Sequence, residues 1–424
     1  MFNYKLAKLL LKNKNPNILF IGVGAHLLTL VYFKYFNFFI DTIQQISGLS
    51  ISSSNIVLPL AISFFTFQQI AYLVDVYQNK VHSQNLLDYS LFVSFFAQLI
   101  AGPIVHHKDI IPQFALSRSF SWLKIQSALI FFSIGLFKKV IVADTLAQFV
   151  DPAFLAASQS YPITFVESWG AVCAYSLQIY FDFSAYSDMA VGLALLFQID
   201  LIHNFNRPYQ ATNIKEFWRR WHISLSLFLK NYLYIPLGGN RISRFRTKLN
   251  LIITMGLGGL WHGSQWTFVL WGLLHGLYLL IYESIFRVTT IKIPRLFATI
   301  FTFFLVSIAW VLFRSPDLHT AITMYQGLFT LNGIELDYRS IEAFSLHYPL
   351  IQARNTPLPY FSFYQMYCLI VLLFVLYFCP CTKDIVDYIK IQEKPLLWSI
   401  LISILFVFSI VCLEQQHQFI YFRF

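Results

Sequence analysis

The stretch MGLGGLWHGSQW, from Met255 to Trp266, places a histidine between two strongly apolar runs. An ionisable side chain at membrane depth is costly, so it commonly marks a functional site. Trp261 and Trp266 would give flat apolar walls, and burial favours the neutral imidazole, which accepts a proton as a general base. The neighbouring glycines allow backbones to approach closely: Gly256, Gly258, Gly259 and Gly263. His262 is therefore the first catalytic candidate; alternatively, it only hydrogen-bonds a neighbouring helix.

A second histidine, His222, lies in the stretch IKEFWRRWHISLSLFLKNYLYIPLGG. Aromatic and aliphatic residues recur there at three- and four-residue spacing: Phe217, Trp221, Leu225 and Phe228. This pattern predicts an amphipathic helix along the cytoplasmic interface that ends at Pro236. The basic residues Arg219 and Arg220 lie off the apolar stripe and could hold an anionic substrate. A simple interfacial brace is the alternative, but such a brace does not need His222.

The stretch YSLQIYFDFSAYSDMAVGLALLF, from Tyr175, holds two carboxylates in an apolar context. Asp182 and Asp188 would be expensive in lipid and should face the protein interior or water. Gln178 and nearby hydroxyl groups can hydrogen-bond around them. Two hypotheses follow: a structural polar network, or a wall of a substrate tunnel.

The remaining histidines give no metal site. His275 follows His262 by 13 residues, which is about 220° around a continuous helix, so we expect the two to lie on different faces and His275 to be a packing residue. The cluster from His106 to Asp109 follows Gly102 and Pro103, where a polar turn is expected. The sequence has no His-x-x-x-His, Cys-x-x-Cys or phosphate-loop motif, so neither a metal nor ATP-driven transport is predicted.

The amino-acid composition indicates the class of protein that contains these candidate residues. The chain has 424 residues, of which 57% are hydrophobic and 12% charged, whereas soluble domains have roughly 25% charged residues. Long apolar runs recur along the whole length, so we predict an all-α, polytopic membrane bundle. The net charge of +10 is explained by basic cytoplasmic loops, and no nucleic-acid partner is expected.

We predict one membrane domain over residues 1–424, with short or re-entrant helices around a cavity. The region 201–250 carries nine basic residues and one acidic residue, so it should be cytoplasmic, like the N-terminus and Lys383–Lys394. Ser315–Tyr360 should lie outside. The predicted membrane segments are Ile18–Phe33, Ile56–Val74, Leu91–Val105, Ile125–Ala143, Phe165–Phe181, Met189–Ile199, Leu249–Leu260, Trp266–Ile281, Leu296–Phe313, Phe363–Phe378 and Leu397–Cys412.

Several stretches, in this order, resemble the membrane-bound O-acyltransferase family, and in particular its alginate O-acetyltransferase-like branch. They include LPLAISFFTFQQIAYLVDVYQ from Leu58, AQLIAGPIVHHKDIIPQF from Ala97, and GLFKKVIVADTLA from Gly135. The polar stretch from Tyr175 follows, then NFNRPYQATNIKEFWRRWHISLSLFLKNYLYIPLGGNR from Asn204 and GGLWHGSQWTFVLWGLLHG from Gly258. The family usually has about two further apolar helices before the segment near Asn3.

The resemblance implies a helical bundle with a central tunnel that joins the two sides of the membrane. It implies that His262 of the Trp-His-Gly motif is catalytic and that His222 of the Arg-Trp-His motif is a second functional residue. We expect six residues to contact substrates: Trp261, Asp182, Asp188, Gln178, Arg219 and Arg220.

The resemblance also implies a reaction. Acetyl-CoA would be the cytoplasmic acyl donor, with no bound cofactor, and an extracytoplasmic polysaccharide would be the acceptor. A periplasmic partner with an esterase fold would finish the transfer, and the chain would lie in the lipid of the bacterial inner membrane. D-alanyl transfer from a carrier protein to teichoic acid, and a non-enzymatic transporter or flippase, are the alternatives.

Overall fold

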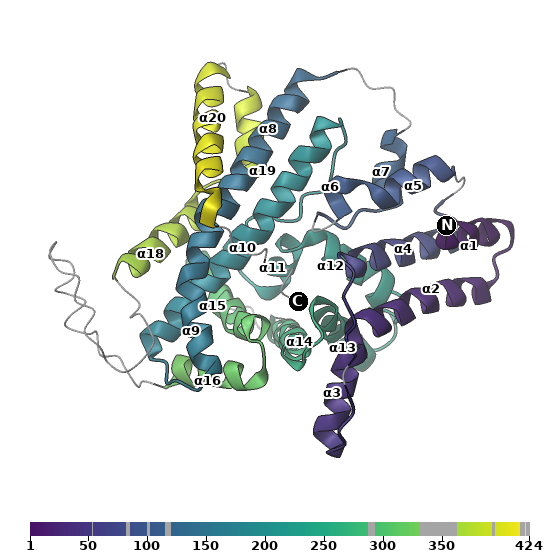
Figure 1. The fold of residues 1–424 in the computed structure, drawn as a ribbon, viewed down its shortest axis with the longest axis horizontal. Coiled ribbons are helices and arrows are strands. Elements are labelled where there is room, and N and C mark those ends of the chain that lie inside the picture. The colour runs from purple at the N-terminus through teal and green to yellow at the C-terminus, as the bar shows by residue number, and fades with distance from the viewer. Residues whose placement is uncertain are drawn as a thin grey trace.

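The computed structural model describes most of the chain, and in that part every regular element is a helix, as predicted. Figure 1 shows long helices at different tilts rather than one parallel bundle. The described residues are 1–52, 54–81, 85–99, 102–114, 120–286, 293–330, 363–391, 395–415 and 420.

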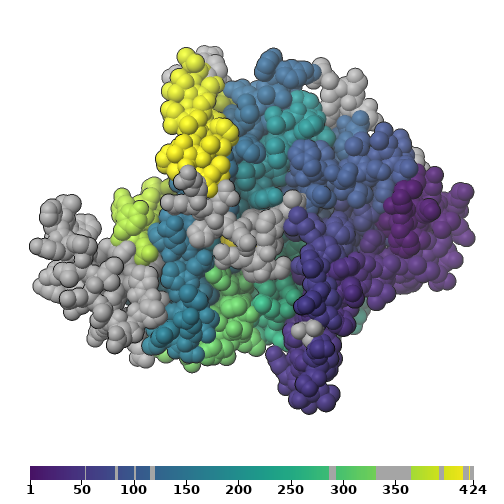
Figure 2. Space-filling view, in the orientation of Figure 1, coloured from purple at the N-terminus to yellow at the C-terminus, as the bar shows by residue number. Residues whose placement is uncertain are grey.

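The N-terminal helices form one flank of the molecule, where α1 and α2 both pack against α4 (Figure 1). Asn15 caps α2 by accepting a hydrogen bond from the Asn17 amide, and Pro16 occupies the first turn, a typical helix start. Figure 2 shows that α3 protrudes from the body. The elements are α1 (Phe2–Lys12), α2 (Pro16–Leu30), the π-helical η1 (Val31–Tyr35), α3 (Phe36–Ser47), α4 (Ile62–Tyr77), α5 (Leu86–Ser94), α6 (Phe96–Leu99) and α7 (His107–Phe114).

Four helical stretches in the described residues are long and apolar enough to cross a membrane, and a fifth is a pair bent by 55°. The chain is therefore a multi-pass membrane protein. The stretches are Pro16–Ser47, Trp122–Ser158, Trp266–Ile285 and Arg295–Arg314, with Tyr364–Phe378 and Thr382–Lys390 as the bent pair.

Helix α10 (Phe165–Leu196) is long and mostly buried, and it packs against α8 (Trp122–Phe137) and α9 (Asp144–Ser158). The π-helical η2 (Lys138–Ala143) joins those two. Thr164 and Glu167 form a capping box that starts α10. The prediction that Phe165–Phe181 and Met189–Ile199 are separate segments is wrong, because the helix continues through the polar stretch between them.

The basic region was predicted to hold one amphipathic helix, but the structure shows four short helical segments instead. The bounds are η3 (Pro208–Gln210), α11 (Ile214–Arg220), α12 (Ile223–Leu229) and the π-helical η4 (Lys230–Tyr234). The chain turns between α11 and α12, where His222 adopts a left-handed conformation with φ of 41°. The predicted apolar stripe is buried inside the protein instead of facing lipid, with Phe217, Trp221 and Leu225 at most 2% exposed.

The helices α13 (Arg244–His262) and α14 (Trp266–Phe286) form a hairpin whose break is the Gly-Ser-Gln stretch after His262. The hairpin is tight because glycines face each other: a Cβ on Gly259 would lie 2.2 Å from the Phe268 carbonyl oxygen and 3.1 Å from the Gly272 Cα. Helix α15 (Arg295–Arg314) packs against α14, and α16 (Leu318–Phe329) follows. The rest of the predicted outer segment Ser315–Tyr360, from 331 onward, lies outside the described residues.

The C-terminal helices lie at the opposite flank from α1, and α20 packs along α8 (Figure 1). Large apolar side chains of α20 are exposed, including Leu396, Ile404 and Val411, as expected for a surface that faces lipid. The bounds are α18 (Phe363–Phe378), α19 (Thr382–Ile391), α20 (Pro395–Val411) and the 3₁₀-helical η5 (Cys412–Gln415).

Candidate active site

His262 is the last residue of α13, so the helix break fixes where its imidazole lies. The side chain is buried in a layer of aromatic rings. The ring centroids of Trp261, Trp271 and Phe313 lie 5.0, 5.2 and 5.2 Å from that of His262. Three elements, α13, α14 and α15, thus supply an apolar surround for one imidazole.

The predicted wall residue Trp266 lies elsewhere. Its side chain is 44% exposed, packs 5.5 Å from the Phe38 ring and donates a hydrogen bond to the Thr42 hydroxyl at 3.2 Å. Its place beside His262 is taken by Trp271, five residues further along α14. Sequence proximity suggested Trp266, but a helix that folds back brings a more distant tryptophan to the site.

His222 meets His262 at the turn between α11 and α12, with ring centroids 6.4 Å apart. Its side chain is fully buried, with Phe183 edge-on at 4.7 Å. Neither ring nitrogen has a hydrogen-bond partner in the part of the chain that the structure describes. Burial lowers the pKa of His222 to about 3, so its imidazole is neutral at physiological pH.

The backbone of the His222 turn is fastened to the segment before η3. The Ile223 amide donates to the Asn204 carbonyl at 3.0 Å, and the Ser224 amide donates to the Asn204 Oδ1 at 3.2 Å. The Asn206 amide donates to the Arg220 carbonyl at 2.9 Å. Asn204 thus stabilises the strained turn by accepting two hydrogen bonds from its backbone. Its sequence context did not reveal this role.

Trp261 lies close to both histidines, and its ring is fixed by contacts with α4. Its ring stacks on Phe67 at 5.1 Å and meets Phe64 edge-on at 5.2 Å. Its Nε1 donates to the Ser63 carbonyl at 3.4 Å, and its centroid lies 6.3 Å from that of His222. The geometry suits the predicted role of Trp261 as a wall of the site, and substrate contact stays a prediction.

His275 lies closer to the site than a continuous helix would allow. Since the chain reverses after His262, the ring of Trp271 lies between the two histidines, with centroids 4.9 Å from His275 and 5.2 Å from His262. The other ring neighbours of His275 are Trp218 and Phe217 of α11, Tyr278 of α14 and Trp310 of α15. The expectation of separate faces fails because it assumed an unbroken helix, while the packing role agrees with this aromatic cage.

The two aspartates of α10 each form an ion pair with one of two consecutive lysines of η2. Asp182 pairs with Lys139 at 2.8 Å, and Asp188 pairs with Lys138 at 2.8 Å. The Ile420 amide donates to the second oxygen of Asp182, and the Thr382 hydroxyl donates to Asp188. These contacts match the structural-network alternative, because they join α10 to the C-terminal region. Gln178 is buried on the same helix, and substrate binding by these residues stays a prediction.

The two arginines differ in their surroundings. Arg220 pairs with Glu216 at 2.6 Å, one turn earlier on α11. Arg219 is exposed, as are Arg241 and Lys248 near the start of α13. Arg219 is therefore the better placed of the pair to meet an anionic ligand.

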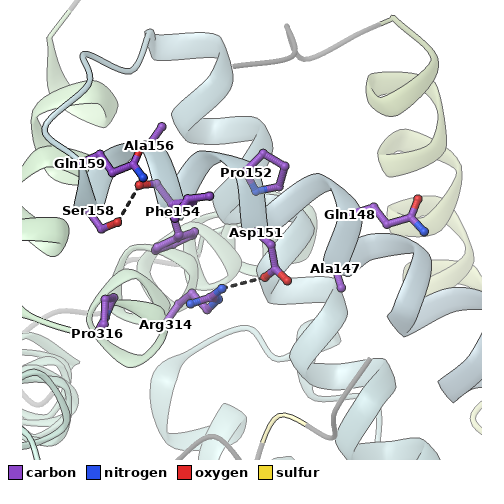
Figure 3. A pocket seen from close by; sticks show the side chains of 11 residues that line it. Ala147, Gln148, Asp151, Pro152, Phe154, Ala156, Ser158, Gln159, Arg314 and Pro316 are labelled. Atoms are coloured by element: carbon purple, nitrogen blue, oxygen red, sulfur yellow. Dashed lines mark hydrogen bonds and ion pairs between the residues drawn. The ribbon is translucent and has the colours of Figure 1, made fainter. Parts of the chain in front are cut away.

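The described residues contain no group of three or more His, Cys, Asp and Glu side chains that could hold a metal ion. A surface cavity of about 720 Å³ lies between α9 and the end of α15, and among its described lining residues none is a predicted site residue. Figure 3 shows Arg314 reaching across it to Asp151, with the ion pair at 2.7 Å. The cavity is thus separate from the two histidines.

The chain is similar to known proteins over most of its length. The model of MBOAT, the membrane-bound O-acyltransferase family, matches residues 76–314. A peptidoglycan O-acetyltransferase of Helicobacter pylori is 39% identical over 100% of this chain and 86% of its own length. A probable alginate O-acetylase of Pseudomonas putida is 43% identical over 75% of this chain and 66% of its own. A teichoic acid D-alanyltransferase of Streptococcus thermophilus is 26% identical over 54% of this chain and 57% of its own.

The chain therefore belongs to the membrane-bound O-acyltransferase family. It is an O-acyltransferase, an enzyme rather than a passive transporter. Both candidate histidines lie within the matched residues.

Proposed function

We propose that this enzyme moves acetyl groups from cytoplasmic acetyl-CoA to a glycan outside the bacterial inner membrane, with His262 as the general base. The observation that carries the proposal is the meeting of His262 and His222, from elements 40 residues apart, in one buried aromatic layer. Family membership supplies the reaction class, O-acyl transfer.

The chemistry needs a proton acceptor beside the attacking hydroxyl. As the acceptor oxygen attacks the thioester carbonyl carbon, its proton passes to the His262 imidazole, and the new C–O bond forms while the C–S bond breaks. The imidazolium then returns the proton to the departing thiolate. A general base contributes about 10²–10⁴-fold, so positioning of donor and hydroxyl by the surrounding rings must supply much of the rest.

His222 would assist the reaction by binding the acyl donor rather than by accepting the proton. A strained backbone is retained at functional sites when the surrounding structure imposes it, and Asn204 imposes it here. A neutral imidazole with free nitrogens can hydrogen-bond the substrate or the acyl carbonyl. We infer that His222 orients the donor against His262.

The positions of the exposed basic residues suggest where the anionic acyl donor binds. Exposed basic residues gather at the start of α13 and on α11, and Arg and Lys hold phosphates well: Arg219, Arg241, Arg244, Arg246 and Lys248. Their excess also predicts that this region is cytoplasmic, where acetyl-CoA is available.

Peptidoglycan is the first acceptor to test, because the relative named for it aligns with the whole of this chain. Alginate comes second, since its relative aligns with three quarters. A periplasmic esterase-fold partner that completes the transfer fits either acceptor. D-alanyl transfer has less support, because that relative shares 26% identity over about half the chain.

The test measures ester-linked acetate released by mild alkali from purified cell-wall peptidoglycan. Cells would express the wild type, His262→Ala, or the control His319→Ala, which alters an exposed histidine hydrogen-bonded to Ser160. The proposal expects acetate to disappear only with His262→Ala. Acetate that persists in that variant contradicts the base, and acetate found only on another glycan contradicts the acceptor.

A further inference from the structure

The position of His262 depends on how the end of α13 is held. The last carbonyl groups of any helix lack partners within the helix and need others. His262 is the terminal residue of α13, so a fraying last turn would move the imidazole directly. The partners of these carbonyls are therefore part of the site's construction.

Those partners come from one short segment near the N-terminus. The Lys34 ammonium donates to the carbonyl oxygens of Trp261 at 2.7 Å and His262 at 3.1 Å. The hydroxyl of the next residue, Tyr35, donates to the Leu260 carbonyl at 3.0 Å. Two consecutive side chains thus bind three consecutive carbonyls that lie more than 220 residues away in sequence.

The segment that supplies these donors is one of three π-helical segments among the described residues. Residues Val31–Tyr35 form the π-helical η1. In proteins generally, π-helical turns are rare, and those that occur are often at functional sites. Lys34 lies within the candidate span Pro16–Ser47, where a lysine is costly unless it pairs with carbonyls or serves a function. A cation is also stabilised by the negative end of a helix dipole.

The same lysine ties a third helix to the site. Its ammonium also lies 3.3 Å from the Ser63 hydroxyl, at the start of α4. The Ser63 carbonyl in turn accepts the hydrogen bond from the Trp261 indole. The end of α13 is thus fastened both through its backbone and through the side chain next to His262.

We propose that Lys34 and Tyr35 form a clamp that sets the position of the His262 imidazole for acyl transfer. They are positioning residues, since they bind the backbone of the catalytic turn and act through it. The clamp rests on the proposed role of His262 as the base. A purely architectural role for Lys34 would alter the amount of folded enzyme but not the turnover of each folded molecule.

The test uses Lys34→Met, Lys34→Arg and Tyr35→Phe, with Lys5→Met as the control for removing an exposed lysine from α1. Each purified enzyme is assayed in lipid vesicles with radiolabelled acetyl-CoA as donor and peptidoglycan fragments as acceptor, and the rates are normalised to folded protein measured by size exclusion. A misplacement of about 1 Å at a reacting centre costs on the order of 10²-fold. We expect Lys34→Met to lower kcat by this order with the KM for acetyl-CoA within twofold.

Lys34→Arg should recover much of the lost kcat, because it keeps a cation that can donate to the same carbonyls. Tyr35→Phe, which removes one hydroxyl, should lower kcat by about tenfold. A kcat for Lys34→Met equal to that of Lys5→Met would overturn the clamp. If Lys34→Met is not recovered folded, a normal kcat for Tyr35→Phe overturns it instead.

His262→Ala, assayed beside these variants, separates the two hypotheses. If His262→Ala is inactive while Lys34→Met is fully active, the clamp is wrong and the base stands. If His262→Ala is fully active, the proposed base is wrong, whatever the lysine variants do.

Discussion

At the scale of single residues, the most informative feature is the backbone of His222. A non-glycine residue in the left-handed region costs about 1–3 kcal/mol, and here the residue with φ of 41° is a histidine beside the catalytic candidate. Glycine would fit this conformation without strain. Five other described non-glycine residues also have positive φ, so it is the burial of the imidazole beside His262 that makes the side chain of His222 worth testing.

Substitution at this position should separate stability from activity. His222→Gly should unfold at a higher temperature than His222→Ala, because glycine relieves about 1 kcal/mol of backbone strain. Both variants should lose acyl transfer if the imidazole orients the donor. Thermal unfolding in detergent and acetyl transfer, measured on the same preparations, test this. Equal unfolding temperatures would contradict the strain, and an active His222→Gly would contradict the role of the imidazole.

Residue types and motifs were enough to choose His262 and His222 as candidates, and the structure brings their rings within 6.4 Å of each other, but their neighbours could not be predicted. Trp271 and Phe313 reach His262 only because α14 and α15 fold back against α13. Lys34 directly follows the predicted segment Ile18–Phe33, so in the sequence it resembles an ordinary flanking charge. A lysine in the middle of the longer span Pro16–Ser47 is the signal that could have found it.

At the scale of elements, buried charges misled the prediction of helix ends. Asp182 and Asp188 read as the boundary of a membrane segment, yet α10 continues past both because Lys139 and Lys138 pair with them. In the basic region the apolar periodicity was correct and the single helix was wrong. The turn at His222 depends on hydrogen bonds to Asn204, 18 residues earlier, which local periodicity cannot reveal.

The tight α13–α14 hairpin can be tested with matched glycines on one helix. Gly259→Ala would place a Cβ 2.2 Å from the Phe268 carbonyl oxygen, whereas Gly256→Ala would meet a flexible leucine side chain at 3.1 Å. Overpacking costs typically about 1–3 kcal/mol, so Gly259→Ala should lower the unfolding temperature and the activity. Gly256→Ala should change either little. Equal behaviour of the two variants would show that close helix approach does not position His262.

At the scale of the whole molecule, transfer from a cytoplasmic donor to an acceptor outside requires a fixed orientation of the chain in the membrane. Helix α10 has 32 residues, which corresponds to about 48 Å at 1.5 Å per residue, more than the roughly 30 Å hydrocarbon core. Helix α10 is mostly buried inside the protein and is not one of the four apolar stretches named above, but its length would carry its two ends to opposite sides of the membrane. The end that leads into the basic region 201–250 should be cytoplasmic.

This orientation can be tested by labelling single cysteines with a membrane-impermeant maleimide, in a background that lacks the five native cysteines. Gln159→Cys and Arg241→Cys replace exposed residues, one before the start of α10 and one in the basic region. The first should label from outside in intact spheroplasts and the second only after lysis. Labelling of both from the same side would contradict the predicted donor and acceptor sides.

The central claim is that His262 is the base for acyl transfer, and the most direct measurement is turnover by the purified enzyme in lipid vesicles. Radiolabelled acetyl-CoA as donor and peptidoglycan fragments as acceptor would be supplied to the wild type, His262→Ala and the control His319→Ala. If His262 is the base, His262→Ala should lower kcat by about 10²–10⁴-fold, with KM and folding retained, while His319→Ala matches the wild type. A kcat for His262→Ala within twofold of the wild type would contradict it.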